Sequence, residues 1–531
     1  MYYFLLVISI LYFVFAIYKT YAWIVAYKWV IVQQSSYRSE QDNHALSPDV
    51  VLFIPALREQ SLVDETIEYF NQMPYVDGKL HICFITTEKE SFQKNEKLKM
   101  LNEWLSSKLK INALDELEKK NKGFFPRYIL PQVLDMIQQY NNDLDMLVMH
   151  VTEIYQSIPL TKNLIQERLE KIQVPNMNLL HYPETQGNKP EQLNYALNQL
   201  KNVLKDKNVN FDKAYIGVYD FDARPDYRTI YEIASHVSDR NQTKKREALM
   251  FQQVQVPFSN LQDFNQKSER LLLRGFSTLY LRRVFGIELY KMKKVLKINA
   301  TRIPSILKAI LRPVSYGIGS GMFLHYNFFS RYGGFPSPLE DLASGYRVNM
   351  LGEDMVPLSV FNFMEGYDSY QQMSNSGSIC FAGAMRIIKD YRIINGFDKK
   401  NNLKRIEKSS LVFKEWIEST FWLISVPLLI TVFVLACVLA DFLILGLLVL
   451  TFVLRFFLDT VIFQQIIIKI CELYKGKELQ GVNIGFSKRL FIVLTSPIQG
   501  LTRIMSPIKA LIKLIKIKFL GIATTQTKTE R

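Results

Sequence analysis

The stretch Tyr215-Ile-Gly-Val-Tyr-Asp-Phe-Asp-Ala-Arg-Pro-Asp226 decides the fold class of this 531-residue chain. It is a short apolar run followed at once by two aspartates, Asp220 and Asp222, with Phe221 between them. An apolar run of this length predicts a buried strand, and parallel sheets bind ligands where such strands end. On extended backbone the two carboxylates would share a face while Phe221 turns toward the core. Paired carboxylates at that position suit Mg²⁺ or Mn²⁺, which bridge substrate phosphates.

The apolar run of this stretch, Ala214–Tyr219, is one of several that alternate with helical patterns. The others lie at Val50–Ile54, Leu80–Ile85, Leu179–Leu180 and Ala248–Val256. This alternation predicts βαβ units, and therefore an α/β fold with a largely parallel sheet. After the first run, Ser61 and Asp64 predict a capping box that opens a helix.

An interruption separates the second and third runs, at about residues 91–172. It is polar, rich in Lys, Glu, Asn and Gln, and has helix-like Leu and Ile spacing. We interpret it as a helical insertion. Because it carries no recognisable chemistry, a structural or partner-docking role is favoured over a catalytic one.

A second acidic motif, Glu340-Asp341, lies in Gly333-Gly-Phe-Pro-Ser-Pro-Leu-Glu-Asp-Leu-Ala-Ser-Gly-Tyr-Arg347. The glycines and prolines predict a turn, and a helix should begin near Leu342. A carboxylate at this place could take a proton from an attacking hydroxyl. It could equally be an acid at the helix N-terminus that stabilises the helix dipole, and the motif alone does not separate the two interpretations.

Composition places the chain at a membrane. The hydrophobic fraction is 48%, but it is concentrated in three runs, Tyr3–Val32, Trp416–Ala440 and Leu443–Ile468. About 20 apolar residues span a bilayer. The first run lacks the basic n-region and the small-residue cleavage site of a signal peptide. The second and third runs predict a helical hairpin with its turn at Asp441.

The basic residues predict the orientation of these runs. Lys and Arg follow the first run, precede the second and follow the third: Lys19, Lys28, Arg38; Lys399, Lys400, Lys404, Arg405, Lys408, Lys414; Lys469, Lys475, Lys477. By the positive-inside rule, residues 35–415 and the C-terminus should be cytoplasmic. Inside the third run, Arg455 and Asp459 stand one helical turn apart and should pair with each other.

The net charge of +15 fits this placement better than nucleic-acid binding, for which no module is present. From Lys475 onward there are 11 Lys/Arg and only 2 Glu. Lys488–Phe519 mixes apolar residues with Lys509, Lys513 and Lys516, an amphipathic pattern that suits the membrane interface. Four scattered cysteines, Cys83, Cys380, Cys437 and Cys471, indicate neither a zinc site nor a disulfide scaffold, as in a reducing cytoplasm.

Five ordered motifs over about residues 50–355 resemble the family 2 glycosyltransferases with a GT-A catalytic domain, the group that includes cellulose-synthase-like and hyaluronan-synthase-like membrane enzymes. The motifs are IPALREQ (54–60), GNKPEQLNYAL (187–197), DFDARPD (220–226), GSGMFLHY (319–326) and GGFP with LEDLASGYRV (333–336 and 339–348). The ending TKTER (527–531) is also similar. At the first motif the family usually has Asn-Glu, where this chain has Arg58-Glu59.

The resemblance implies a GT-A domain with transmembrane helices at both ends. The expected parts are a transmembrane helix (1–34), a cytoplasmic catalytic domain (35–415), a transmembrane hairpin (416–470) and an interfacial tail (471–531). It also implies a multi-pass protein of the cell membrane that transfers sugar with inversion from a nucleotide sugar, expected to be a UDP-sugar, in cell-surface glycan synthesis.

The resemblance assigns roles to individual residues. Asp341 would be the general base beside Glu340, and Asp220 and Asp222 would hold the metal and the donor diphosphate. The donor-binding set would be Pro55, Glu59, Thr87, Glu88, Lys189 and Asn194. The acceptor-binding set would be Gly319, Gly321, Phe381 and Arg386.

One departure bears on the product. Processive relatives carry Gln-x-x-Arg-Trp where this chain has Gly377-Ser-Ile-Cys-Phe381. Phe381 is expected to stack on a sugar and Arg386 to supply the missing charge. Transfer to a lipid-linked or saccharide acceptor is therefore favoured over a processive polysaccharide synthase. A non-catalytic membrane scaffold is the alternative from another class.

Overall fold

The computed structural model describes residues 2–36, 47–75, 79–107, 129–140, 143–243, 245–256, 282–366, 370–397, 403–458, 460–462 and 486–520. The expectations for Arg38, Asp459, Cys471, the basic residues at 399–400 and 469–477 and the ending at 527–531 fall outside these residues. The chain divides into two compact units. We call Asp49–Asp222 the parallel-sheet unit, and Met1–Pro48 with Ala223–Thr524 the helix-rich unit.

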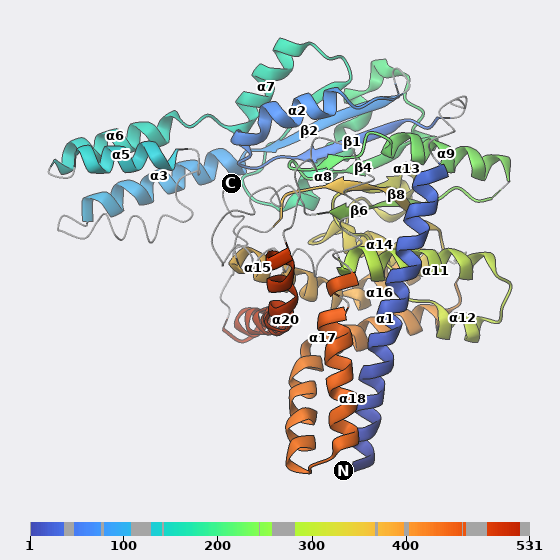
Figure 1. Ribbon diagram of the computed structural model, residues 1–531. Coiled ribbons are helices and arrows are strands. Elements are labelled where there is room, and N and C mark those ends of the chain that lie inside the picture. The colour runs from blue at the N-terminus through green and yellow to red at the C-terminus, as the bar shows by residue number, and fades with distance from the viewer. Residues whose placement is uncertain are drawn as a thin grey trace. The chain divides into compact units, whose positions relative to one another are not determined.

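Four parallel strands form the core of the parallel-sheet unit, in the order β3-β2-β1-β4. Figure 1 labels β1, β2 and β4 among them. They are β1 (Val50–Pro55), β2 (Leu80–Thr87), β3 (Met177–Tyr182) and β4 (Tyr215–Val218). Every residue of β2 and β4 is buried, as expected for strands covered on both faces. The apolar runs therefore predicted these strands and their parallel pairing.

Helices surround this sheet and also fill the described part of the interruption. They are α2 (Val63–Asn71), α3 (Lys89–Ser107), α5 (Leu130–Gln139), α6 (Leu144–Ser157), α7 (Thr161–Ile172) and α8 (Lys189–Val203), with short turns η2 (Gln60–Leu62), η3 (Lys205–Lys207) and η4 (Phe211–Lys213). The capping box expected at Ser61 is wrong, because α2 begins only at Val63, after a turn whose cap makes no side-chain hydrogen bond. A capping box forms at α8 instead, between Asn188 and Glu191.

The sheet of the helix-rich unit is mixed, in the order β7-β6-β8-β5. Its strands are β5 (Arg224–Pro225), β6 (Met250–Val256), β7 (Met322–His325) and β8 (Met355–Phe363). Strand β6 runs parallel to β8 and antiparallel to β7, and its register shifts between Gln252 and Val254. The expectation of a largely parallel sheet thus applies to the other unit and not to this one.

The helix-rich unit takes its name from the helices that follow. They are α1 (Tyr2–Ser36), α9 (Thr229–Gln242), η6 (Arg282–Glu288), α11 (Leu289–Ala300), α12 (Ser305–Leu311), α13 (Tyr326–Tyr332), α14 (Glu340–Leu351), α15 (Tyr370–Ala384), α16 (Ile387–Phe397), α17 (Arg405–Val438), α18 (Phe442–Phe452), η7 (Val453–Leu458) and α20 (Phe486–Leu520). Helix α14 begins at Glu340, two residues before the expected start near Leu342.

Three helices of the described chain are long and apolar enough to cross a membrane: Tyr2–Gln33, Arg405–Val438 and Phe442–Ile462. They pack together through a small apolar core that includes Leu5, Val432 and Leu448. Helix α17 begins at Arg405 and not at Trp416, because the basic segment ahead of the apolar run is helical as well.

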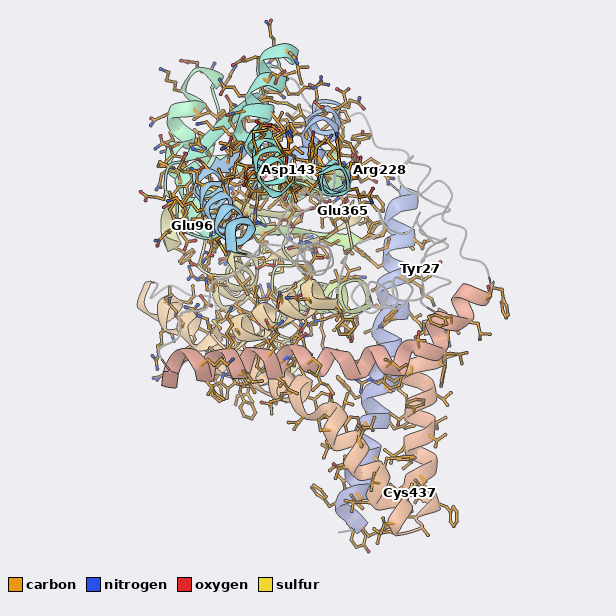
Figure 2. All side chains as sticks on the ribbon, turned by 90° about the vertical axis from the view of Figure 1, so that its left-hand side faces the viewer. Tyr27, Glu96, Asp143, Arg228, Glu365 and Cys437 are labelled. Carbon is orange, nitrogen blue, oxygen red and sulfur yellow. The ribbon has the colours of Figure 1, made fainter. Side chains whose placement is uncertain are left out.

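The N-terminus and the α17–α18 turn lie at the same end of this three-helix bundle (Figure 1). Cys437, near that turn, marks the same end in Figure 2. At its other end the bundle joins the rest of the helix-rich unit, where Trp23 of α1 lies against Gly286 of η6. A Cβ at Gly286 would approach the indole to 2.7 Å, so the helix and η6 are in close contact.

Candidate functional site

In the parallel-sheet unit, the Asp220–Asp222 motif occupies a turn. Strand β4 ends at Val218, and Phe221 and Asp222 form a turn instead of continuing it. The expectation of an extended backbone through both aspartates is therefore wrong. Phe221 is buried as expected, because its ring packs edge-on against Phe84 and its carbonyl accepts a hydrogen bond from the Thr66 hydroxyl at 2.9 Å. This anchoring fixes the turn beyond the strand end.

The two carboxylates differ in environment. Asp222 is 5% exposed, whereas the Asp220 side chain is 36% exposed and its Oδ1 lies 2.8 Å from the Lys189 ammonium. Lys189 is the first residue of α8, so the helix N-terminus also faces this way. Mg²⁺ at phosphate sites takes one or two carboxylates and completes its shell with phosphate and water. Asp220 and Asp222 fit that donor set, and no described group of three or more His, Cys, Asp or Glu could hold a metal alone.

The remaining donor-side candidates belong to the same unit, and all except Asn194 lie at or just after the ends of β1 and β2. Pro55 ends β1, and Thr87 ends β2 with its hydroxyl accepting from the Lys89 amide at 3.3 Å. Glu59 is buried after β1, and its amide donates to Thr161. Asn194 is half-buried on α8.

Glu88 makes an interaction that the sequence did not indicate. Its carboxylate lies 3.0 Å from His181 Nε2 at the end of β3, and His181 Nδ1 lies 3.0 Å from the Thr86 hydroxyl. The hydrogen bond from His181 lowers the pKa of Glu88. Glu88 therefore stays ionised and held in place at neutral pH.

A group of cations beside the ends of β1 and β2 was also missed. Arg58 has the positive φ of 56° that is uncommon in a residue other than glycine. Burial, as the main cause, and the positive charge of Arg58, as the second, lower the pKa of Lys89 and bring the pKa of Lys97 to about 7. The Lys89 ammonium donates to the Gly187 carbonyl at 2.8 Å, next to the start of α8. This part of the unit therefore suits an anion.

In the helix-rich unit, Glu340 and Asp341 form the first turn of α14. The cap position is Leu339, so neither acid is the N-cap, although both lie where the helix dipole favours negative charge. Glu340 is buried, and Asp341 is half-buried with its Oδ1 accepting from the Leu342 amide at 2.7 Å. Asp341 is thus the more accessible acid for proton transfer.

Of the two predicted acceptor glycines, Gly319 lies beside Asp341, whereas Gly321 lies against Gln253. Gly319 and Gly321 have φ values of +60° and +84°, which explains glycine at both positions. A Cβ on Gly319 would lie 3.4 Å from Asp341 Oδ2. The segment that carries them also touches α14 directly: a Cβ at Gly345 would lie 2.1 Å from the Gly317 amide nitrogen. The structure therefore brings the segment of Gly319 and the first turns of α14 together, and its role as an acceptor site stays a prediction.

Three buried glutamines of β6 hold this segment, and they were not among the residues selected from the sequence. Gln252 Oε1 accepts from the Ile318 amide at 2.9 Å, and Gln255 Nε2 donates to the Ser320 carbonyl at 2.9 Å. The backbone N–H of Gln253 donates to the Gly321 carbonyl, also at 2.9 Å. Buried and satisfied amides of this kind rigidify a segment. A polar FQQVQV strand inside an apolar core is the signal that could have revealed them.

A row of side chains continues from Asp341 toward α17. Burial raises the pKa of Cys380 to about 11, with a further upward contribution from Asp341 and a downward one from Arg283. The Arg283 guanidinium donates to the Tyr316 hydroxyl and lies 5.2 Å from the ring centre of Trp422. Trp422 is half-buried and belongs to α17.

The other two acceptor-side candidates lie along α15 and just after it. Phe381 is only 2% exposed and packs edge-on against Trp422 at 5.7 Å, so its ring faces protein. Arg386 is exposed in the turn after α15. The expectation that Phe381 presents a stacking face is therefore not met in this structure, because Trp422 and the surrounding core cover it.

Comparison with known proteins gives likenesses of fold only at low similarity. No protein-family model and no curated protein matches the chain. Among solved structures, a mannosyltransferase from Pyrobaculum calidifontis in complex with GDP-Man and Mn²⁺ matches at 12% identity and a TM-score of 0.37, over 94% of this chain and 99% of its own. Residues 1–349 of TarS from S. aureus match at 8% identity and 0.33 (88% and 91%), and at 9% and 0.34 (88% and 92%) with UDP-GlcNAc. At these TM-scores the likenesses carry no functional conclusion.

Proposed function

We propose that this chain is a membrane-bound inverting glycosyltransferase that transfers a sugar from a nucleotide-diphosphate donor to a lipid-linked or saccharide acceptor. One observation carries the proposal: the chain has one group of residues suited to bind a nucleotide-diphosphate donor and another suited to deprotonate an acceptor hydroxyl. The parallel-sheet unit has an acid pair with a lysine and a cation group, and the helix-rich unit has a half-buried acid beside Gly319, a glycine in the left-handed conformation.

The donor half rests on charge. Asp220 and Asp222 are the residues that would hold Mg²⁺ or Mn²⁺, which would neutralise the diphosphate when bound. Lys189 is already within 2.8 Å of Asp220 and would contact a phosphate oxygen. Lys89 and Arg58 add positive charge near the strand ends. A nucleoside diphosphate, with a UDP-sugar as the first candidate, matches this mixture of acids and cations.

The acceptor half rests on Asp341. Its carboxylate would remove the proton of the acceptor hydroxyl as that oxygen attacks the anomeric carbon of the sugar. The new C–O bond forms on the face opposite the departing diphosphate, whose bridging oxygen takes the bonding pair, so the configuration inverts. Asp341 keeps the proton and later releases it to water. Glu340, buried beside it, helps to hold the first turn of α14.

Trp422 and Arg283 extend the acceptor side toward α17. They provide an indole and a guanidinium 5.2 Å apart, which are two of the three side-chain types absent from the Gly377–Phe381 stretch. We assign to them the contact with the acceptor sugar that Phe381 and Arg386 were expected to make. If the three long apolar helices cross a bilayer, this row lies near it, and an acceptor anchored in lipid could reach it.

The test uses the full chain in lipid nanodiscs with a panel of radiolabelled nucleotide sugars and an extract of membrane lipids. Transfer of label into lipid that needs Mg²⁺ or Mn²⁺ is the expected result. Hydrolysis without transfer would indicate a missing acceptor. No consumption of any donor, by a protein that binds none of them in calorimetry, would refute the proposal and favour the scaffold alternative.

A further inference from the structure

Helix α20 presents a continuous apolar stripe to its surroundings. Seven large apolar side chains, each 38–58% exposed, lie within an arc of about 100° around the helix axis, at 3.6 residues per turn. They are Leu490, Leu494, Ile498, Met505, Ile508, Ile512 and Ile515. On the opposite face Ser506, Pro507 and Ala510 are buried, and beyond them Leu514 is 45% exposed. A stripe of this length on an exposed face needs a partner.

Charge and position both indicate what that partner is. Lys509, Lys513 and Lys516 border the stripe on one side, where long cationic side chains reach anionic headgroups while the apolar residues enter the acyl boundary. Helix α20 also contacts α17 and runs across the three-helix bundle, not along it (Figure 2). If the bundle spans a bilayer, such a helix lies in the plane of its surface.

The buried face of α20 packs on α15 at very short range. A Cβ at Gly377 would lie 2.5 Å from the Ser506 hydroxyl oxygen and 2.8 Å from Ser506 Cβ, so only glycine allows this approach. The Lys509 ammonium adds a hydrogen bond of 2.5 Å to Asn375 Oδ1, also on α15. Any movement of α20 relative to the bundle would therefore displace α15.

Helix α15 in turn supports the acid pair. A Cβ at Gly383 would lie 2.3 Å from Leu339 Cδ1, and Leu339 is the cap residue directly before Glu340 and Asp341. Gly377 and Gly383 are six residues apart, so they lie on different faces of the same helix. One face thus meets α20, and the other meets the turn that carries the candidate base.

We propose that α20 binds the surface of an anionic bilayer through its apolar stripe and lysines, and that this contact holds α15 against Leu339 so that Asp341 is positioned for reaction. The positioning part rests on the proposed function; the lipid-binding part does not. Each lysine near an anionic surface strengthens binding about fivefold. Activity should therefore depend on anionic lipid, with the acid pair less ordered in its absence.

The lipid contact is tested with a nitroxide spin label attached to the full chain, with its native cysteines replaced. The protein is held in nanodiscs of phosphatidylcholine that contain roughly one third phosphatidylglycerol. Attached at Ile512→Cys, the label should relax faster with oxygen than with a water-soluble nickel chelate. At Glu184→Cys, an exposed control in the other unit, the nickel chelate should dominate. Nickel-chelate dominance at position 512 would overturn the lipid contact, and shielding from both reagents would indicate a protein partner and overturn it too.

The positioning step is tested by hydrogen exchange of the peptide around residues 336–346, which needs no turnover. Exchange should be slower in anionic than in purely neutral nanodiscs, and Gly377→Leu should abolish this difference by forcing α15 from α20. The matched control is Gly396→Leu, since a Cβ at Gly396 meets nothing within 4 Å. Equal exchange in both lipids for the unaltered chain would overturn the coupling.

Transfer activity separates this inference from the proposed function. With a working donor, Gly377→Leu should lower kcat at least tenfold with unchanged donor affinity, and the loss should not respond to anionic lipid. If the unaltered chain shows the expected label and exchange results yet transfers no sugar in any lipid, the proposed function fails and the lipid-coupled helix stands. If transfer is equally fast in neutral and anionic discs, the proposed coupling is wrong and the function stands.

Discussion

Replacing Gly345 with alanine should disable the candidate base from a distance. Gly345 is in the second turn of α14, and its Cα faces the backbone of the segment that leads to Gly319. An added Cβ would lie 2.1 Å from the Gly317 amide nitrogen and 2.5 Å from the Tyr316 carbonyl carbon. Both neighbours are backbone atoms, so no side chain can rotate away to make room.

The size of the effect follows from these distances. Real Cβ contacts essentially never fall below 3.0 Å, so the helix and the segment must separate by about 0.9 Å from the present 2.1 Å. Overpacking of this kind costs about 1–3 kcal/mol of stability. A shift of about 1 Å in a catalytic group reduces the rate by about 10²-fold. Because α14 carries Asp341, transfer should fall by about that factor while the protein stays folded.

The assay compares Gly345→Ala with Gly396→Ala, in which the new methyl group meets nothing within 4 Å. Initial transfer rates at saturating donor, donor affinity by calorimetry and thermal unfolding should be measured for both in nanodiscs. We expect slow transfer, unchanged donor affinity and a lower unfolding temperature for Gly345→Ala alone. Near-normal transfer by a stably folded Gly345→Ala protein would refute the idea that this close approach positions the acid pair.

Three further outcomes are expected. Asp220→Ala should abolish transfer without unfolding the protein, and excess chelator should do the same until Mn²⁺ or Mg²⁺ is restored; full activity in chelator would remove the metal. With the native cysteines replaced, a cysteine at Ser409 should label only after permeabilisation and one at Asp441 from outside, and the reverse pattern would place the site outside the cytoplasm. Burial and the negative charge of Asp341 raise the pKa of Cys380 to about 11. Asp341→Asn should therefore lower that pKa and speed alkylation of Cys380 near pH 9. An unchanged dependence of the alkylation rate on pH would show that Asp341 does not influence the Cys380 thiol.

Local patterns predicted much of this fold because they depend on burial alone. The apolar runs at Val50 and Leu80 became β1 and β2, since a strand covered on both faces must be apolar throughout. Most of the described part of the polar interruption is helical, in α3, α5, α6 and α7, with short non-helical connections such as residues 158–160. The capping box at Ser61 did not form, because Ser61 lies inside the short turn η2 and α2 begins only at Val63, with Leu62 at its cap position.

The candidate site was predicted less completely. Residue types and their order along the chain indicated Asp220, Asp341 and Gly319, because each can be selected from its own motif. Contacts between segments that are distant in the sequence cannot be predicted in this way. The hydrogen bond of Gln252 to the 318–321 segment and the approach of Arg283 to Trp422 therefore came only from the structure. The turn at Asp222 was missed because the strand was taken to continue through it.

The central claim is that Asp341 is the general base, and Asp341→Asn tests it most directly. Asparagine keeps the size of the side chain and an oxygen that can accept the hydrogen bond from the Leu342 amide, now 2.7 Å long. It removes the basicity, and general-base catalysis contributes about 10²–10⁴ in rate. Single-turnover transfer should therefore fall by at least about 10²-fold, with donor affinity and thermal unfolding unchanged. Transfer within a few-fold of the unaltered protein would contradict the claim and leave the reaction without its base.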